Sequence, residues 1–155
     1  MSPLNHDSIG GELDEFKNTL SGELQNAGIE MHKVREEYHA ILLALEEMGS
    51  LSNSLDASND SDAAFNAANS VFTAYTSIYE SFRRAHENLK SKVLGDLRVN
   101  HEWLTSFWSK FTNLLSRLLK NAIAAIQHYA KQLGINSFSV TVSSSPPSIS
   151  VTLNF

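Results

Sequence analysis

The sequence predicts a mainly α-helical protein, an antiparallel, coiled-coil-like bundle of three helices followed by a C-terminal β-hairpin. Apolar residues recur every seven positions through most of residues 1–134, and they alternate with polar residues after Gly134. Only 7 glycines and 3 prolines interrupt the 155 residues, of which 42% are hydrophobic, so residues 1–134 are expected to form one compact helical bundle. Residues 135–155 either belong to the same domain or extend it as a docking segment.

The first helix is expected to span residues 8–49, with Ser8 as its N-cap and Gly49 at its end. Two glycines inside it, Gly22 and Gly28, each cost about 1 kcal/mol relative to alanine. A break near Gly28 would give a bundle of four helices instead, and the sequence leaves both alternatives open. The seven-residue repeat that supports one continuous helix consists of Leu13, Leu20, Ala27, Val34, Ile41 and Met48.

A loop and a second helix are expected next. Residues 50–60 are rich in Ser, Asn and Asp, whose side chains compete for backbone hydrogen bonds, so they predict a loop that delivers Ser61 as the next N-cap. The second helix then spans residues 61–94 and places aromatic side chains in the core. Its repeat contains Phe65, Phe72, Tyr79, His86 and Val93.

The third helix is expected to span residues 101–134. It follows a turn at residues 95–100, which holds a helix-ending Gly95 and a helix-capping Asn100. Its apolar stripe is broader than one coiled-coil seam, so this helix must bury more than one face. Acidic side chains outnumber basic ones in residues 8–49, and the reverse holds in residues 101–134, so the first and third helices are expected to attract each other as neighbours.

The third helix also has the character of a cationic helix that lies on a membrane surface. A wide apolar face, aromatic residues near one end and basic residues on the polar side are typical of such helices. The ordinary alternative is a helix buried at the centre of the bundle. The residues that would contact a membrane or a partner are Trp103, Phe107, Trp108, Lys110, Phe111, Arg117 and Lys120.

After Gly134 the sequence predicts two short strands joined by residues 143–148, where two prolines interrupt any ladder. No charged residue occurs between Gln132 and Phe155, although natural sheets usually protect free edges with charge. The apolar face must therefore be covered, either by the protein's own helices or by another chain. This face comprises Phe138, Val140, Val142, Ile149, Val151, Leu153 and Phe155.

The composition argues against several classes of function. The formal net charge is −5, whereas nucleic-acid binding needs a basic surface, so nucleic acid is not an expected partner. The absence of cysteine excludes thiolate nucleophiles and cysteine-ligated metals. Because the sequence has neither a glycine-rich phosphate loop nor a nucleophile elbow, we expect neither an enzyme nor a bound cofactor.

Two histidines need separate treatment. His39 follows Glu36 with the Glu-x-x-His spacing of di-iron bundles, but both positions fall on the solvent side of the repeat, so no metal site is expected. His86 lies at a core position among aromatic residues, where a titratable side chain can act as a pH-sensitive switch. The ordinary alternative is an imidazole that is hydrogen-bonded to a buried tyrosine or lies near an open end of the bundle.

These patterns favour a non-enzymatic interaction or assembly module, whose uncharged hairpin mediates self-association or docking to a protein partner. One alternative is a membrane-active secreted effector or toxin component that uses the helix at 101–134 and the hairpin. Another is a small ligand carrier or enzyme with a pocket near His86.

The sequence also favours a particular location. Residues 1–16 hold no apolar stretch of the kind found in Sec signals, and the longest apolar run, at residues 40–45, is too short to span a membrane. We therefore expect a protein that is cytoplasmic as synthesised, for which secretion would need a non-classical route.

Overall fold

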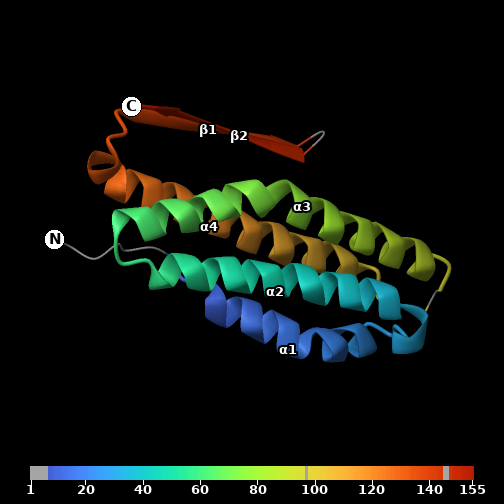
Figure 1. Ribbon diagram of the computed structural model, residues 1–155. Helices are drawn as coiled ribbons and strands as arrows, with labels where there is room; N and C mark the ends of the chain where they lie inside the picture. The colour runs from blue at the N-terminus through green and yellow to red at the C-terminus, as the bar shows by residue number, and fades with distance from the viewer. Residues whose placement is uncertain (1–6, 97, 145–146) are drawn as a thin grey trace.

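The computed structural model describes residues 7–96, 98–144 and 147–155. Within them it contains four helices and a C-terminal antiparallel hairpin, so the mainly helical class and the hairpin are confirmed (Figure 1). The expectation of three helices is wrong at the first helix, which is divided in two. The elements are α1 (Gly10–Asn26), a 3₁₀ turn (Met31–Lys33), α2 (Arg35–Ala57), α3 (Ser61–Val93), α4 (Glu102–Leu133), β1 (Ser137–Ser144) and β2 (Pro147–Asn154).

The division between α1 and α2 occurs at Gly28. This residue has a φ of +88°, a left-handed conformation that glycine adopts without the clash that a side chain would cause. A Cβ atom at this position would lie 3.1 Å from the carbonyl oxygen of Arg98. The preceding carbonyl, of Ala27, accepts a hydrogen bond of 3.0 Å from the backbone N–H of Asn100. The α1–α2 turn is therefore docked on the connection between α3 and α4.

Two helix ends also differ from the prediction. Gly49 does not end a helix, and the loop expected at residues 50–60 is helical as far as Ala57. Ser52 and Leu55 explain this extension, because they are only 1% and 2% exposed and the helix is needed to place them in the core. At the start of α1 the N-cap is Ile9 and not Ser8.

The boundaries of α3 and α4 agree closely with the sequence. The N-cap of α3 is Asp60 instead of Ser61, and its side chain accepts a hydrogen bond of 2.8 Å from the backbone N–H of Ala63. Before α4, the side-chain oxygen of Asn100 accepts a hydrogen bond of 3.1 Å from the N–H of Glu102. At the other end of α4, Gly134 has a φ of +73° and terminates the helix in the left-handed conformation.

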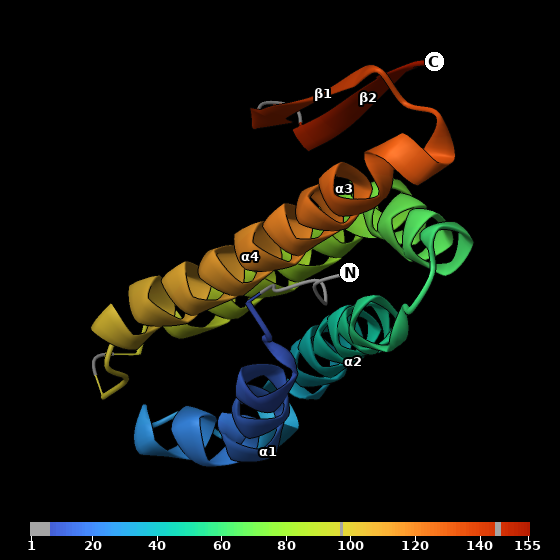
Figure 2. The ribbon, with the colours of Figure 1, turned by 90° about the vertical axis from the view of Figure 1, so that its left-hand side faces the viewer.

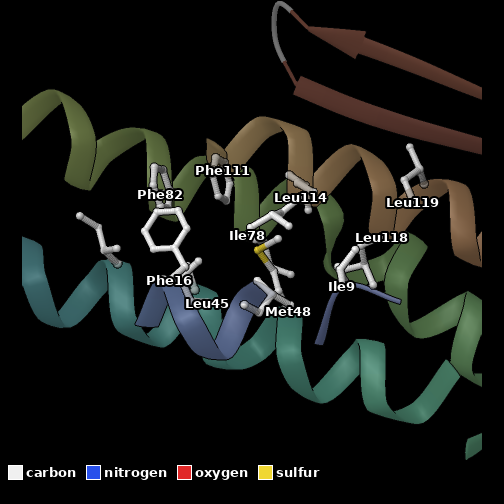
Figure 3. Packing of buried hydrophobic residues seen from close by; sticks show 14 of the residues in the cluster. Ile9, Phe16, Leu45, Met48, Ile78, Phe82, Phe111, Leu114, Leu118 and Leu119 are labelled. Carbon is white, nitrogen blue, oxygen red and sulfur yellow. The ribbon is translucent and has the colours of Figure 1, made fainter. Parts of the chain in front are cut away.

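The core runs along the length of the bundle and is aromatic near its middle. The rings of Phe82 in α3 and Phe111 in α4 are stacked with centroids 3.7 Å apart (Figure 3). Phe16 of α1 packs on Phe107 of α4, with ring centroids 5.0 Å apart. The buried residues of α4 include positions that face α1 and others that face α3. The broad apolar stripe of this helix therefore covers more than one neighbour.

The hairpin lies against the helices with its apolar side inward. Its register pairs Phe138 with Leu153 and Val140 with Val151, so these residues share one face of the sheet. The strand β2 runs along α3, and the two views show the hairpin on the side of the α3–α4 pair that is remote from α1 (Figures 1 and 2). The connection predicted at residues 143–148 is too long, because residues 143–144 belong to β1 and 147–148 to β2. Pro147 pairs with Ser144 in the ladder, at the edge-strand start where proline is tolerated. Positions 145–146 lie outside the described residues.

Replacement of Gly28 by alanine tests the division of the first helix. We expect Gly28→Ala to lower the free energy of unfolding by about 1–3 kcal/mol, because it strains the left-handed backbone and crowds the Arg98 carbonyl. Gly22→Ala is the matched control, because Gly22 lies inside α1 with open space around it, and this change should stabilise by about 0.5–1 kcal/mol. Urea unfolding measures both changes in stability. Equal changes for Gly28→Ala and Gly22→Ala would contradict a division of the helix at Gly28.

Candidate functional site

A buried carboxylate lies at the end of the bundle where the α1–α2 turn contacts the connection between α3 and α4. Glu37, in the first turn of α2, is 5% exposed. Its Oε1 lies 2.8 Å from Nζ of Lys92 near the end of α3, and the same ammonium donates a hydrogen bond of 3.0 Å to the carbonyl oxygen of Lys33. Glu37 Oε2 is buried and has no hydrogen-bond partner among the described residues. Lys92 thus ties α3 to both α2 and the turn before it.

A cavity of about 170 Å³ lies beside this ion pair. Its charged lining is internally paired, since Lys33 contacts Glu30 at 3.0 Å and Asp96 contacts Arg98 at 3.1 Å. These contacts hold the pKa of each of the two carboxyls below its ordinary value. The carboxyl groups at the cavity are therefore each paired with a cation. The remaining side chains of the lining are apolar and belong to Ile29, Val34, Val93 and Val99.

His86 is half-buried between α3 and α4. Its Nε2 lies 2.9 Å from the carbonyl oxygen of Leu104, so this nitrogen carries the proton and donates the hydrogen bond. The ring centroid lies 5.2 Å from that of Trp108 and 6.5 Å from that of Phe82. The imidazole is thus hydrogen-bonded to a backbone carbonyl, and not to the tyrosine that one of the alternatives invoked. A pH-sensitive role for this histidine stays a prediction.

The Glu-x-x-His pair on α2 is exposed to solvent. Both Glu36 and His39 lie on the outer side of the helix, as the repeat predicts. Across the described ranges, no group of three or more His, Cys, Asp or Glu side chains is arranged to hold a metal ion.

The residues singled out in α4 divide between two sides of the helix. Trp108 faces α3, where its ring packs edge-on to Tyr79 at 5.6 Å. Phe107 and Phe111 are buried, and Lys120 is exposed. Trp103 and Lys110 line a cleft that α1 closes on its other side. The structure does not bring all seven residues together as one surface.

Opposite charges join α1 and the segment before it to α4, as the charge distribution predicts. Arg117 pairs with Asp7 and, at 2.6 Å, with Glu12. Lys110 lies 3.5 Å from Glu23 and 4.8 Å above the ring of Phe16. Hydrogen bonding to Arg117 holds the pKa of Glu12 below its ordinary value.

Sequence reasoning missed Asn121, which is 5% exposed in the leucine-rich stripe of α4. Its side chain accepts a hydrogen bond of 3.2 Å from the backbone N–H of Asp7 and donates one to the backbone carbonyl of the same residue. The signal was present, because an asparagine between Leu118 and Ala122 interrupts an apolar face. Asn121 and Arg117 together fix the segment that precedes α1.

The predicted hairpin face is directed toward the protein's own core. Five of its seven residues are partly buried against the helices, and these are Phe138, Val140, Ile149, Val151 and Leu153. Val142 is 45% exposed and Phe155 is 74% exposed. A partner that contacts this face therefore meets only part of it while the hairpin is docked.

Comparison with known proteins leaves the function to be argued from the structure. The sequence matches no protein-family model, and no curated protein and no solved structure matches it. None of the helices in the described part of the chain combines the length and the hydrophobicity required to cross a bilayer.

Breaking the Glu37–Lys92 pair should be costly. Lys92→Met leaves a buried carboxylate without its cation. Because Lys92 is 44% exposed, water already screens part of the attraction, so we expect the free energy of unfolding to fall by only about 1–3 kcal/mol. Lys90→Met, at an exposed position on the same helix, is the control and should change stability by less than about 0.5 kcal/mol. Denaturant unfolding measures both, and indistinguishable midpoints would show that the ion pair contributes nothing.

Replacement of His86 tests whether its imidazole is structurally essential. We expect His86→Leu to leave the stability near pH 7 unchanged or raised, because leucine is cheaper to bury. The Leu104 carbonyl keeps its helical hydrogen bond, so no acceptor is orphaned. Thermal unfolding measures the change, and a loss of several kcal/mol would contradict this expectation.

Proposed function

We propose that this protein is a non-enzymatic interaction module that self-associates through its C-terminal hairpin. The observation that carries the proposal is an uncharged, two-stranded sheet whose outer edges are unpaired in the described part of the chain. Unpaired edges present N–H and C=O groups that readily pair with another strand, and natural proteins usually protect them with charge. Residues 132–155 offer no charge for that purpose.

The docked position of the hairpin favours edge pairing over burial of its apolar face. That face is largely turned toward the helices, so a partner strand approaches the sheet from the side. The strand β2 runs along α3, which leaves the edge of β1 farther from this helix. We therefore assign the association to β1.

A second copy of the same chain is the partner that fits this edge. Antiparallel pairing of two β1 strands about a twofold axis extends each sheet from two strands to four. The two edges carry no like charges that would repel each other. The new strand would also cover part of Val142, which is 45% exposed.

Charge on β1 should prevent this association. Ser139 and Thr141 are exposed on the outer face, so Ser139→Lys with Thr141→Lys should preserve the fold but place like charges across the new ladder, only about 5 Å apart. The control is Ser150→Lys with Thr152→Lys on β2, because two copies of β2 would lie about 14 Å apart in a four-stranded sheet.

Light scattering measures the mass of each protein in solution, and circular dichroism measures its helical content. We expect the unmodified protein and the β2 variant to have a mass above that of one chain, and the β1 variant to be a monomer with unchanged helical signal. A monomeric unmodified protein at high concentration contradicts self-association. Equal masses for the two variants would contradict the choice of β1.

A further inference from the structure

The helices α1 and α4 contact each other through side chains, with the ring of Phe16 packed on that of Phe107 at 5.0 Å. Two clefts lie between them, of about 210 Å³ and about 170 Å³, on either side of the contact between Phe16 and Lys110. By contrast, the backbone of α3 runs closely along both α2 and α4. Figure 2 shows α1 beside α2 on the outside of the bundle. The α1–α4 seam is thus a place where the bundle can open without separating its other helices.

Charge links α1 to α4 beside the packing of Phe16 on Phe107. Arg117 pairs with Asp7 and Glu12, and Lys110 pairs with Glu23. Lys110 is 49% exposed and Glu12 is 54% exposed, so water and other anions reach both groups. The Lys110–Glu23 pair, at 3.5 Å, is of the exposed kind that is weak and exchanges readily with competing anions. Arg117 is 22% exposed and is bound by two carboxylates, so it is the stronger of the two contacts.

The face of α4 beneath α1 combines cations with aromatic and apolar side chains. Trp103, Phe107 and Leu114 line the two clefts, and Lys110 contributes to both. Arg117 follows Lys110 two helical turns later along the same seam. Bases beside an apolar face that contains tryptophan characterise helices that lie in the interface of an anionic membrane.

We propose that α1 is a cover over a lipid-binding face of α4, and that an anionic membrane surface displaces it. The lipid phosphates take the place of the α1 carboxylates on Lys110 and Arg117, since both are oxygen anions that bind guanidinium and ammonium groups. The turn at Gly28 is the point about which α1 moves away. The fully buried apolar side chains of α1 enter the acyl region with α4, which replaces the apolar burial lost from the bundle.

A charge-reversed cover tests the proposal in the full chain. Glu12→Lys with Glu23→Lys places cations opposite Arg117 and Lys110 and loosens the cover. Glu46→Lys with Glu47→Lys, at exposed positions of α2 outside the seam, is the control, because it shifts the formal net charge of −5 by the same amount. Co-sedimentation uses vesicles of phosphatidylcholine alone and of phosphatidylcholine mixed with phosphatidylserine.

The expected result separates the two variants. The cover variant should sediment with phosphatidylserine vesicles at least severalfold more than the control variant, and neither should sediment with phosphatidylcholine alone. When both variants also carry Trp108→Phe, Trp103 is the one remaining tryptophan, and brominated phosphatidylserine lipids should quench its fluorescence more strongly in the cover variant than in the control variant. Equal binding by the two variants, or equal binding to both kinds of vesicle, overturns the proposal.

Two further measurements keep the result decisive. Glu23→Lys with Lys110→Glu restores the attraction and removes a lysine from α4, so it should abolish the gain of lipid binding. If the cover variant loses its helical signal, hydrogen exchange of α1 in the unmodified protein decides. Exchange should accelerate when phosphatidylserine vesicles are added, and unchanged exchange overturns the proposal. A cover variant whose mass rises above that of the unmodified protein, without binding of vesicles, assigns the seam to a protein partner and also overturns the proposal.

Discussion

The docking of the Gly28 turn on the connection between α3 and α4 sets the arrangement of the whole bundle. One backbone hydrogen bond, from Asn100 N–H to the Ala27 carbonyl, and the close approach of Gly28 to Arg98 fix where the chain reverses. Lys92 reinforces the same junction through Lys33 and Glu37. Because the turn is held by the opposite connection, α2 can lie against α3 while α1 is left to close the outside.

This arrangement divides the molecule into a tightly packed and a loosely packed part. The helices α2, α3 and α4 share a core around Phe82 and Phe111, whose stacked rings allow little change of spacing. The helix α1 adds Leu13, Phe16 and Leu20 to that core, but clefts remain on either side of its contact with α4. A part of the molecule with fewer contacts opens at lower free energy than the rest.

The sequence was sufficient to predict those elements at whose ends the spacing of apolar residues changes. The bounds of α3 and α4 and the strands of the hairpin follow from the repeat, from Gly95 and Gly134, and from the alternation after Gly134. The division at Gly28 could not be decided, since the repeat continues on both sides and Gly22, which lies within α1, gives the same local signal. The two glycines differ in their tertiary contacts. The carbonyl of Arg98, about 70 residues farther along the chain, lies close to Gly28, whereas Gly22 has open space around it.

The same reasoning explains the polar residues that were missed. Glu36 and Glu37 are adjacent and chemically alike, yet only Glu37 is buried, because Lys92 reaches it from α3. Asn121 is satisfied by the backbone of Asp7, a partner that no local pattern identifies. Buried polar groups are paired by tertiary contacts, so their partners are known only when the helices have been placed.

The hairpin and α1 occupy opposite sides of the α3–α4 pair, and this separation makes their two proposed activities independent (Figure 2). The hairpin covers α3 with an uncharged apolar face and leaves strand edges open, whereas α1 covers α4 through opposite charges. Salt screens the second contact but has little effect on the first, because hydrogen bonding between neutral strands carries no net charge. Ionic strength thus acts on the α1 cover while the strand edge remains available.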